Sequence, residues 1–498
     1  MLPDPRDLFC KDLPTTPRPN IGKVLVAGAT GYVGGRLVPE LLSRGYNLRV
    51  MVRNRITNTN KWPNTEVVVA DALKEDQLDA ALEGIQVAYY LIHSLNLGPV
   101  GFADADMIAA GNFQNAASKQ GVKRIIYLGG VGDERNCHSN HLRNRMAVTQ
   151  ILRQGSVPVT ALRAAVIIGS GSASYEIIKN LVLNLSILLL PTWARNRCQP
   201  IAIRDVIKYL VGVLESEKST GESYEIGGKD ILSYEDMLKT CAQILGTKTL
   251  FIHFPNMNIS FYSYMASLFT PVPAPIIRCL MEGLKDNTVC SEDNITHLIP
   301  YQTISYREAI VRALSREEQD KVYTRWSDAY PPAHELAIKL SELTEPPSFT
   351  TRYSFLTRKS AASLFLNICK IGGKDGWFRN NWMWRLRGLV DRILMGVGTA
   401  RGRKSAHWIE INDVIDFFRI ENIIRNELLL LRAEMKLPGR AWLEFRIENH
   451  PKGNNLLTVI AYFQTKTFFG KLYWYLFLPF HHIIFKDLIE EIDARSLF

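Results

Sequence analysis

The chain has 498 residues, so it exceeds one ordinary domain and predicts about three units. Hydrophobic residues make up 47% and charged residues 22%, which is typical of a soluble globular protein. Seven scattered cysteines without a CxxC pair argue against a disulfide framework or a zinc site and favour a reducing compartment. The net charge is +10, but the basic residues are too dispersed along the chain to favour nucleic acid as a partner.

The amino terminus and the apolar segments give no sign of export or membrane insertion. Residues 1–20 are rich in proline and charge and lack the apolar core of a signal peptide, so we expect a disordered lead-in. No segment has the length of unbroken apolar sequence that a membrane span needs. The two nearest candidates, residues 177–193 and 472–485, are interrupted by polar residues or too short. We therefore expect a cytoplasmic protein.

A strand, a glycine turn and a helix follow one another near the start. Residues 24–27 form the continuous apolar run of a central parallel strand, and residues 36–42 have helical spacing. Between them, the first glycine of the turn permits a tight bend, the second lets a pyrophosphate approach the backbone, and the third lets the helix pack on the strand. The helix N-terminus then faces the diphosphate. An ordinary strand-turn-helix is the alternative, but this context favours dinucleotide binding. The predicted cofactor contacts in the turn are Gly28, Thr30, Gly31, Tyr32, Val33 and Gly34.

The end of the second predicted strand bears on the choice of cofactor. NAD-selective Rossmann proteins place a carboxylate there, whereas this chain has Arg53 after residues 48–52. A guanidinium holds a 2′-phosphate through two donors, and a carboxylate would repel it. The alternative is that Arg53 lies in solvent at the strand end. The sequence thus favours NADP(H) over NAD(H).

Further cofactor contacts are expected at the ends of the third and fourth strands. Asp71 and Ala72 follow residues 66–70, where a carboxylate can accept a hydrogen bond from the adenine amino group. Capping the helix that begins near residue 75 is a compatible role for Asp71. His93 and Ser94 lie where the fourth strand exits, at the edge where an open α/β sheet holds its ligand. A histidine there commonly orients the cofactor.

The first part of the chain resembles the atypical or extended short-chain dehydrogenases/reductases, in particular the NmrA-like and complex-I-39-kDa-subunit-like branch. The resemblance rests on the glycine turn and on residues 52–53, 71–72, 89–94, 127–130, 162–169, 199–206 and 224–228. It implies an NAD(P)-binding Rossmann domain with a substrate lobe, which we place at residues 21–330. The matching motifs are not specific for any substrate.

The catalytic residues that the resemblance implies are missing. Gly129 and Gly130 stand where a serine is expected, and His141 and Arg145 have the spacing of the family's Tyr-x-x-x-Lys pair. Arg145 keeps a positive charge that can hold ribose hydroxyls or a phosphate. His141 ordinarily titrates near neutrality, so it is a candidate proton donor to a carbonyl. The alternative is that His141 caps or lines the helix start without any chemistry.

A second domain is predicted after a proline-rich linker at residues 331–350. Antiparallel strands are expected within residues 351–498, at 429–435, 441–448 and 455–463, before a helix from Gly470 to the end. From Gly372 onward the chain resembles a domain of unknown function that is fused to such Rossmann domains. We therefore expect a doubly wound α/β Rossmann domain followed by an α+β helix-grip domain with an antiparallel sheet. The START-like outline implies a cavity for a lipid-like or aromatic ligand; the alternative is that the aromatic residues are core.

Two functions stay open. One is an NADP(H)-dependent oxidoreductase acting on a small hydrophobic, quinone-like or lipid-like molecule, which a second ligand-type domain favours. The other is a non-catalytic redox sensor or assembly factor, which the missing serine and tyrosine favour. Basic residues within 379–404 and the aromatic segment 472–485 permit weak docking to an anionic membrane, and with it a location peripheral to the inner membrane. The alternative for these residues is an ordinary solvated surface.

Overall fold

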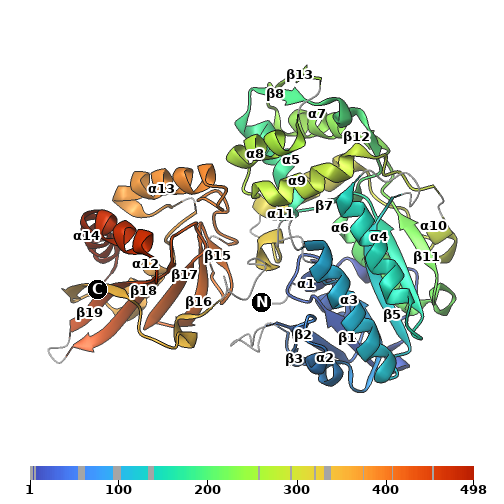
Figure 1. The fold of residues 1–498 in the computed structure, drawn as a ribbon, viewed down its shortest axis with the longest axis horizontal. Helices are drawn as coiled ribbons and strands as arrows, with labels where there is room; N and C mark the ends of the chain where they lie inside the picture. The colour runs from blue at the N-terminus through green and yellow to red at the C-terminus, as the bar shows by residue number, and fades with distance from the viewer. Residues whose placement is uncertain are drawn as a thin grey trace. The chain divides into compact units, whose positions relative to one another are not determined.

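The computed structural model describes residues 4, 7–53, 62–93, 102–132, 139–255, 258–291, 294–318, 321–329, 338–373, 375–405, 408–450 and 454–497. The chain divides into two compact units, Met1–Pro332 and Ala333–Phe498 (Figure 1). Within the described ranges, no helix combines the length and the apolar composition that crossing a membrane would require.

The first unit is built on a parallel sheet of seven strands, in the order β11-β6-β5-β4-β1-β2-β3. Its strands are β1 (Lys23–Ala27), β2 (Leu48–Val52), β3 (Glu66–Val69), β4 (Ile85–Tyr90), β5 (Arg124–Gly130), β6 (Val159–Ala164) and β11 (Ser223–Ile226). The direction in which the chain adds strands reverses between β1 and β4. Such a reversal point is where open α/β sheets hold their ligands, at the carboxyl ends of the strands.

The alternation of side chains along β1 explains why helices cover both faces of this sheet. Val24 and Val26 belong to the core beneath α1 (Gly34–Ser43) and α6 (Ile203–Glu215). Leu25 and Ala27 belong to the opposite core, beneath α2 (Glu75–Leu82), α3 (Phe102–Lys119) and α4 (Asn140–Arg153). Because successive side chains of a strand point to opposite faces, a run that is apolar throughout must be covered on both sides.

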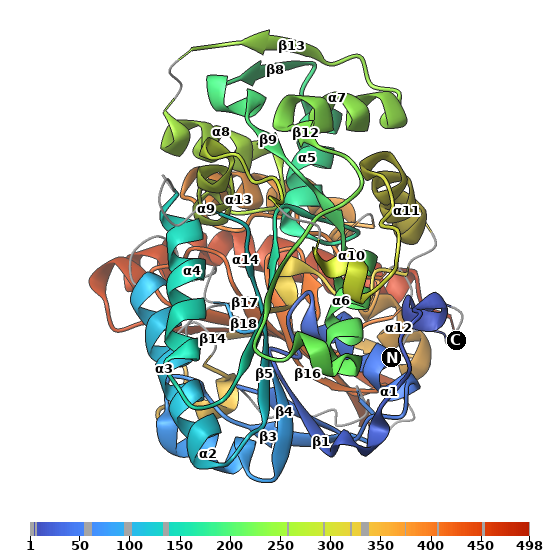
Figure 2. The same cartoon turned by 90° about the vertical axis from the view of Figure 1, so that its right-hand side faces the viewer.

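A second lobe of the first unit has a hydrophobic core of its own. Its main elements are α5 (Ala173–Asn184), α7 (Tyr234–Leu245), α8 (Ile259–Phe269), α9 (Ala274–Glu282), α11 (Tyr306–Glu318) and the two-stranded parallel sheet of β8 (Ile187–Leu190) and β13 (Leu250–His253). Shorter elements are β7 (Ile167–Ile168), β9 (Arg197–Cys198), β10 (Ile201–Ala202), β12 (Leu232–Ser233) and α10 (Asn294–Leu298). Figure 2 shows β8, β13, α7 and α8 together at the end of the unit remote from α2.

Two segments outside these elements also belong to the first unit. Residues 1–20 were expected to be a disordered lead-in, but the part of this segment that the structure describes from residue 7 onward packs against α1. The side chain of Cys10 is 2% exposed, and the backbone N–H groups of Phe9 and Cys10 donate to the carboxylate of Glu40 at 2.6 and 3.0 Å. At the other end, Trp326 donates its backbone N–H to the Gly171 carbonyl at 2.8 Å.

The second unit is an antiparallel sheet of six strands, in the order β14-β19-β18-β17-β16-β15. Its elements are β14 (Phe349–Thr357), α12 (Ala361–Ile368), α13 (Asn381–Ile393), β15 (Val414–Ile415), β16 (Phe418–Ile424), β17 (Leu428–Ala433), β18 (Arg440–His450), β19 (Asn454–Gln464) and α14 (Phe468–Ala494). The long α14 lies on β14 and β19, where Trp474 stacks on Phe349 and Phe463 with ring centroids 5.4 and 5.7 Å apart.

The second unit begins earlier than the expected boundary at residue 351. The backbone N–H of Leu340 donates to the carboxylate of Glu421 at 2.7 Å, and β14 starts within the expected linker. Paired prolines predicted a connection here, but the strand that follows them completes the sheet by pairing with β19, about a hundred residues later in the chain.

A cluster of charges is buried inside the second unit. The carboxylate of Glu434 is 2.7 Å from a guanidinium nitrogen of Arg401, 2.6 Å from one of Arg419 and 3.5 Å from one of Arg432. Burial by itself would raise the pKa of Glu434, but Arg419 and Arg401 lower it to about 2. The cluster therefore keeps its carboxylate ionised in a largely dry interior.

Candidate functional site

The glycine turn has the geometry that the sequence predicts. Gly28 has φ +90°, and a Cβ there would lie 2.6 Å from the Leu91 carbonyl oxygen of the neighbouring strand end. A Cβ on Gly34 would lie 2.3 Å from the Gly28 carbonyl oxygen, so only glycine lets α1 approach the strand this closely. At Gly31 a Cβ would meet one atom, the Gly28 oxygen at 3.2 Å. The space beside Gly31 is thus open to a ligand.

The start of α1 is suited to an anion. No side chain caps this helix end, so its first N–H groups point outward from the turn. The guanidinium of Arg36 lies 4.2 Å from the ring centroid of Tyr32 and donates to the carbonyls of Thr324 at 3.0 Å and Ser170 at 2.8 Å. Arg36 therefore adds positive charge to the first turn and ties Tyr32 to the second lobe. Sequence reasoning missed both Arg36 and Thr324, whose positions in the chain are 288 residues apart.

The other predicted cofactor contacts follow β2 and β3. Arg53 comes directly after β2, and its side chain is exposed. Asp71 shapes its own turn, because its carboxylate accepts from the backbone N–H of Leu73 at 3.1 Å. The N-cap of α2 is Lys74, so the expected capping role of Asp71 is wrong. Ala72 is buried, and its carbonyl accepts from Asn112 of α3 at 3.1 Å. Ser94 lies outside the described residues.

A buried polar cluster lies beyond the end of β4. The ring Nδ1 of His93 is 3.1 Å from the carboxylate of Asp106, which also accepts from the amide of Asn144 at 3.1 Å. Asp106, on α3, is 1% exposed. His93 is two residues past Leu91, whose carbonyl oxygen lies beside Gly28 of the glycine turn. The cluster therefore lies beyond the carboxyl end of β4, near the glycine turn. Its positioning residues Asp106 and Asn144 were not predicted, because each is an ordinary polar residue within an amphipathic helix.

The same cluster contains His141. The rings of His93 and His141 have centroids 5.4 Å apart, and Nδ1 of His141 is 3.2 Å from the thiol of Cys279 on α9. The N-cap of α4 is Ser139, which accepts from the Leu142 N–H, so His141 does not cap the helix. Cys279 comes from the second lobe and is 138 positions from His141 in the chain. The expected proton donor thus lies between the Rossmann sheet and the second lobe.

Burial changes the protonation of the cluster. Burial, with His93 and Arg145 nearby, lowers the pKa of His141 well below its usual value near 6.5. Burial and Arg145 also lower the pKa of His93, against the opposing effect of Asp106. The pKa of the Cys279 thiol is raised to about 12, mainly by burial. The expectation that His141 titrates near neutrality is therefore wrong: its imidazole is uncharged at pH 7 and the neighbouring thiol keeps its proton.

Arg145 is largely buried beside β5. Its guanidinium donates to the Leu128 carbonyl and lies 5.0 Å from the ring centroid of Tyr127. Within the described part of the chain, its Nη1 and the amide oxygen of Asn144 have no hydrogen-bond partner although both atoms are buried. Buried polar atoms are almost always paired with protein, water or ligand. Open hydrogen-bonding capacity therefore remains next to the two histidines.

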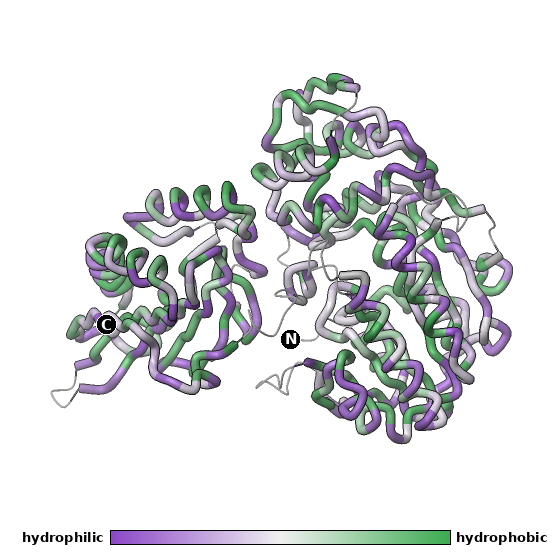
Figure 3. The backbone as a smooth tube through the Cα atoms, in the orientation of Figure 1, coloured by the Kyte–Doolittle hydropathy of each residue, from purple (hydrophilic) through white to green (hydrophobic). Residues whose placement is uncertain are grey.

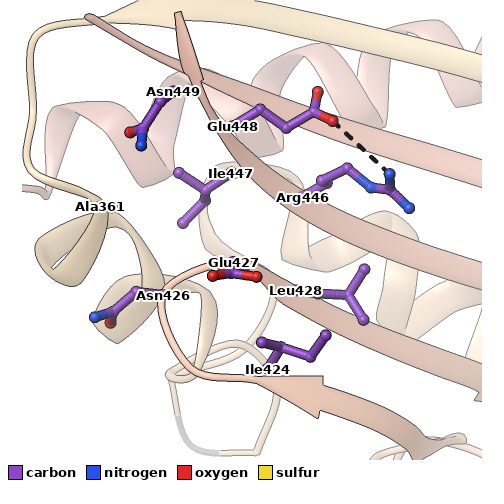
Figure 4. Close-up of a pocket in the computed structure, with 9 residues that line it drawn as sticks. All are labelled: Ala361, Ile424, Asn426, Glu427, Leu428, Arg446, Ile447, Glu448 and Asn449. Carbon is purple, nitrogen blue, oxygen red and sulfur yellow. Dashed lines mark ion pairs between the residues drawn. The ribbon is translucent and has the colours of Figure 1, made fainter. Parts of the chain in front are cut away.

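The second unit has a pocket of about 590 Å³ on β16, β17 and β18. Its wall includes Ile424, Leu428 and Ile447 together with charged and amide side chains. Figure 4 shows Arg446 and Glu448, 3.8 Å apart, paired on β18 beside it. This lining is amphipathic rather than purely apolar.

Two family models match the chain. A model described as NAD(P)H-binding matches residues 28–180, from the first glycine of the turn into α5. A model described as a protein of unknown function, DUF2867, matches residues 344–488, from just before β14 to the last turns of α14. The two matched segments fall one in each unit.

Curated relatives align with the first unit at low identity. The photosystem II assembly factor Ycf39 of Trieres chinensis is 22% identical over 231 residues, 45% of this chain and 69% of that protein. The chloroplastic divinyl chlorophyllide a 8-vinyl-reductase of Arabidopsis thaliana is 23% identical over 251 residues, 47% of this chain and 60% of that protein. The chain spans less than two thirds of the length of most curated relatives it matches.

Among solved structures, the Citrobacter sp. triphenylmethane reductase complexed with NADP(H) is 19% identical, with a TM-score of 0.48 over 58% of this chain and 99% of that one. Residues 28–180 are thus similar to NAD(P)H-binding domains, and residues 344–488 are similar to the DUF2867 family.

Proposed function

We propose that this protein is an NADP(H)-dependent reductase of a hydrophobic, quinone-like or lipid-like carbonyl compound, in which His141 takes the place of the family's tyrosine. The proposal rests on the buried cluster of His93, Asp106, His141 and Cys279, which adjoins the glycine turn and joins the sheet to the second lobe. Clusters of buried, mutually bonded titratable groups at the carboxyl edge of a doubly wound sheet are typical of ligand sites.

The residues around the turn suit a dinucleotide phosphate. The open space at Gly31 and the uncapped start of α1 accept the diphosphate, and Arg53 would hold a 2′-phosphate at the end of β2. Asp71, which follows β3, would contact the adenine. When bound, the nicotinamide supplies the hydride, so the protein mainly has to orient it and to exclude water.

The protein's own contribution is a hydrogen bond from a neutral histidine. In this proposal the thiol of Cys279, whose pKa burial raises to about 12, donates its S–H to Nδ1 of His141 at 3.2 Å, and the ring proton is on Nε2. An Nε2–H group aimed at a carbonyl oxygen stabilises the negative charge that develops there during hydride transfer. The imidazole is not a carrier of a spare proton at pH 7, so the proton that completes the reduction comes from solvent.

Asp106 would orient His93 in the same way. Its carboxylate accepts from Nδ1 of His93 and from Asn144, which fixes the His93 ring and places a proton on Nδ1. The unpartnered Nη1 of Arg145 and the amide oxygen of Asn144 offer further contacts for substrate, cofactor hydroxyls or bound water. In this proposal Arg145, on α4 beside β5, is a positioning residue. It keeps the positive charge of the family's lysine but not its other role.

We also propose that the second unit binds a small hydrophobic molecule. An antiparallel sheet covered by the long α14 supports a helix-grip, START-like outline. The pocket beside Ile447 offers space for such a molecule, with the Arg446–Glu448 pair at its side. Retention of a lipid or quinone through purification, measured by mass spectrometry, is the expected result.

A non-catalytic reader of the cofactor is the second candidate. The absent serine and tyrosine favour it, as does the alignment with a photosystem II assembly factor over 69% of that protein. In this case the histidine cluster would respond to the bound nucleotide without turnover. The two candidates differ in whether bound NADPH is consumed.

The cofactor assignment is tested by calorimetric titration of the full chain with NADPH, NADP, NADH and NAD at fixed salt. We expect tight NADP(H) binding that Arg53→Ala weakens about tenfold or more, since hydrogen bonds to a charged group contribute roughly 1.5–3 kcal/mol. NADH affinity should be unchanged. The matched control is Arg312→Ala, an exposed arginine of α11, which should alter neither. Absence of binding by all four nucleotides would remove the basis for the reductase.

A further inference from the structure

The surface of the second unit is unusually apolar along two helices. Of the 32 large hydrophobic side chains that are exposed in the described residues, fourteen belong to α13, the two residues that follow it, and α14. Trp384 of α13 lies 6.4 Å from Phe485 of α14, measured between ring centroids, so the helices are neighbours. Figure 3 shows hydrophobic residues recurring along both. Soluble monomers rarely expose so many large hydrophobic side chains in one region unless that region is an interaction surface.

The exposed residues of α14 follow the helical repeat. Phe468, Leu472, Leu476, Phe480 and Ile483 are spaced by three or four residues and are 48–74% exposed. They therefore form one outward stripe, whose length is about 22 Å at 1.5 Å per residue. The inward stripe of the same helix includes Trp474 and Phe485, each 5% exposed and packed on the sheet. Since the inward face is already apolar and held, the outward stripe cannot turn into the core.

A second exposed apolar stripe runs along α13. Trp382, Leu386, Leu389 and Ile393 are 53–58% exposed and again three or four residues apart. The exposed charged side chains along both stripes are positively charged. The only acidic residue of α13, Asp391, is fully buried, and no acidic residue occurs between residues 465 and 486.

We propose that α13 and the first half of α14, hereafter the α13–α14 face, dock this protein on an anionic lipid bilayer. Exposed Arg385, Lys466, Lys471 and Lys486 supply the positive charge at the edges of an apolar surface, which is the arrangement of helices that lie in the interfacial plane. A second copy of the chain is the less suitable occupant, because a twofold contact through this face would bring identical lysines together. Such docking would place the first unit near hydrophobic substrates.

The test is co-sedimentation of the full chain with vesicles of phosphatidylglycerol and phosphatidylethanolamine, and with vesicles of phosphatidylcholine alone. We expect binding to the anionic vesicles that falls with salt, and little binding to the neutral ones. Phe468→Ser with Phe469→Ser should abolish binding. Lys466→Gln with Lys471→Gln should lower the partition coefficient about 25-fold, since each basic residue near an anionic surface contributes about fivefold.

Matched controls come from the first unit. Phe261→Ser with Met265→Ser removes two exposed apolar residues of α8, and Lys248→Gln removes an exposed lysine, so neither should alter binding. Unchanged thermal unfolding midpoints show that the variants fold. The proposal is overturned if the wild-type chain stays in the supernatant with anionic vesicles, or if the control variants lose binding equally. It is also overturned if the α13–α14 substitutions instead abolish a dimer measured by light scattering.

Discussion

Each unit buries a polar cluster, and the two clusters are built on opposite plans. In the second unit, three guanidinium groups converge on the single carboxylate of Glu434, so the cluster is held by contacts between opposite charges. In the first unit, the carboxylate of Asp106 is shared by the side chains of His93 and Asn144. In the described part of the chain, the buried amide oxygen of Asn144 and Nη1 of Arg145 have no hydrogen-bond partner.

The difference separates a stabilising role from a ligand-binding role. A buried carboxylate enclosed by arginines costs several kcal/mol to disrupt, because removing it strands the charges around it. A cluster in which imidazole, thiol and amide groups surround one carboxylate, with spare hydrogen-bonding capacity, loses less on mutation of its neutral members and can accept a ligand's polar atoms. Substitutions in the Glu434 cluster should therefore act on stability, and those in the histidine cluster on activity.

The largest expected effect is on the unfolding of the second unit. Glu434→Gln leaves three buried guanidinium groups without their carboxylate and should destabilise the unit by about 3–5 kcal/mol. Urea unfolding followed by tryptophan fluorescence measures it. Glu490→Gln, at an exposed position of α14, is the control and should change the free energy of unfolding by less than about 0.5 kcal/mol. An equal loss in the control would contradict a specific role for the cluster.

Lowering the pH should destabilise the second unit by protonating the carboxylate of Glu434. The pKa of Glu434 is about 2 in the folded state against 4.5 as the reference value, so its stabilising contribution is complete above pH 4.5 and is lost as the pH falls toward 2. The shift corresponds to roughly 3 kcal/mol. Unfolding free energies of the wild type and of Glu434→Gln, measured from pH 6 to pH 2, should converge as the pH falls. A constant gap would show that ionisation of Glu434 is not the source of the stability.

A smaller effect, on rate rather than stability, is expected at His141. His141→Leu removes the hydrogen bond to the developing oxyanion and should lower kcat about 10- to 100-fold, with KM for NADPH unchanged. The wild-type rate should be flat between pH 6 and 8, because the pKa of His141 lies well below 6.5. His253→Leu, which removes a half-exposed histidine of β13, is the matched control. A kcat that follows a group with a pKa near 6.5 would contradict a neutral donor.

The smallest effect is expected at Cys279. Cys279→Ala removes the group that bonds Nδ1 of His141 and should lower kcat by about threefold to tenfold, whereas Cys279→Ser keeps a donor and should restore most of it. The rescue by serine separates a positioning role from simple packing. Rates that are equal in the alanine and serine variants would exclude the proposed control of the tautomer.

The sequence predicted those features that depend on local patterns. The glycine turn, the buried β1 and the four-residue repeat of α1 are encoded within about twenty neighbouring residues, and backbone geometry at Gly28 and Gly34 admits no other side chain. Three strands of the second unit, β17, β18 and β19, were likewise predicted within a few residues, because alternation and turn residues mark them.

Features that depend on distant contacts were not predicted. Cys279 contacts His141, which is 138 positions away in the chain, and Thr324 contacts Arg36, which is 288 positions away. Neither segment contains a local sequence pattern that predicts the contact. The protonation of His141 was predicted incorrectly because its pKa depends on burial, which three-dimensional packing determines. Residues 1–20 were expected to be disordered on composition, yet the buried carboxylate of Glu40 binds the backbone N–H groups of Phe9 and Cys10.

The reductase is tested most directly by mixing the NADPH-loaded full chain with a panel of quinones and lipid-like carbonyl compounds and following absorbance at the NADPH band. We expect at least one compound to oxidise bound NADPH faster than free NADPH, with the acceleration reduced in His141→Leu and retained in His253→Leu. If bound NADPH is oxidised no faster than free NADPH by any compound, the first unit is a reader of the cofactor and the proposed reductase is wrong.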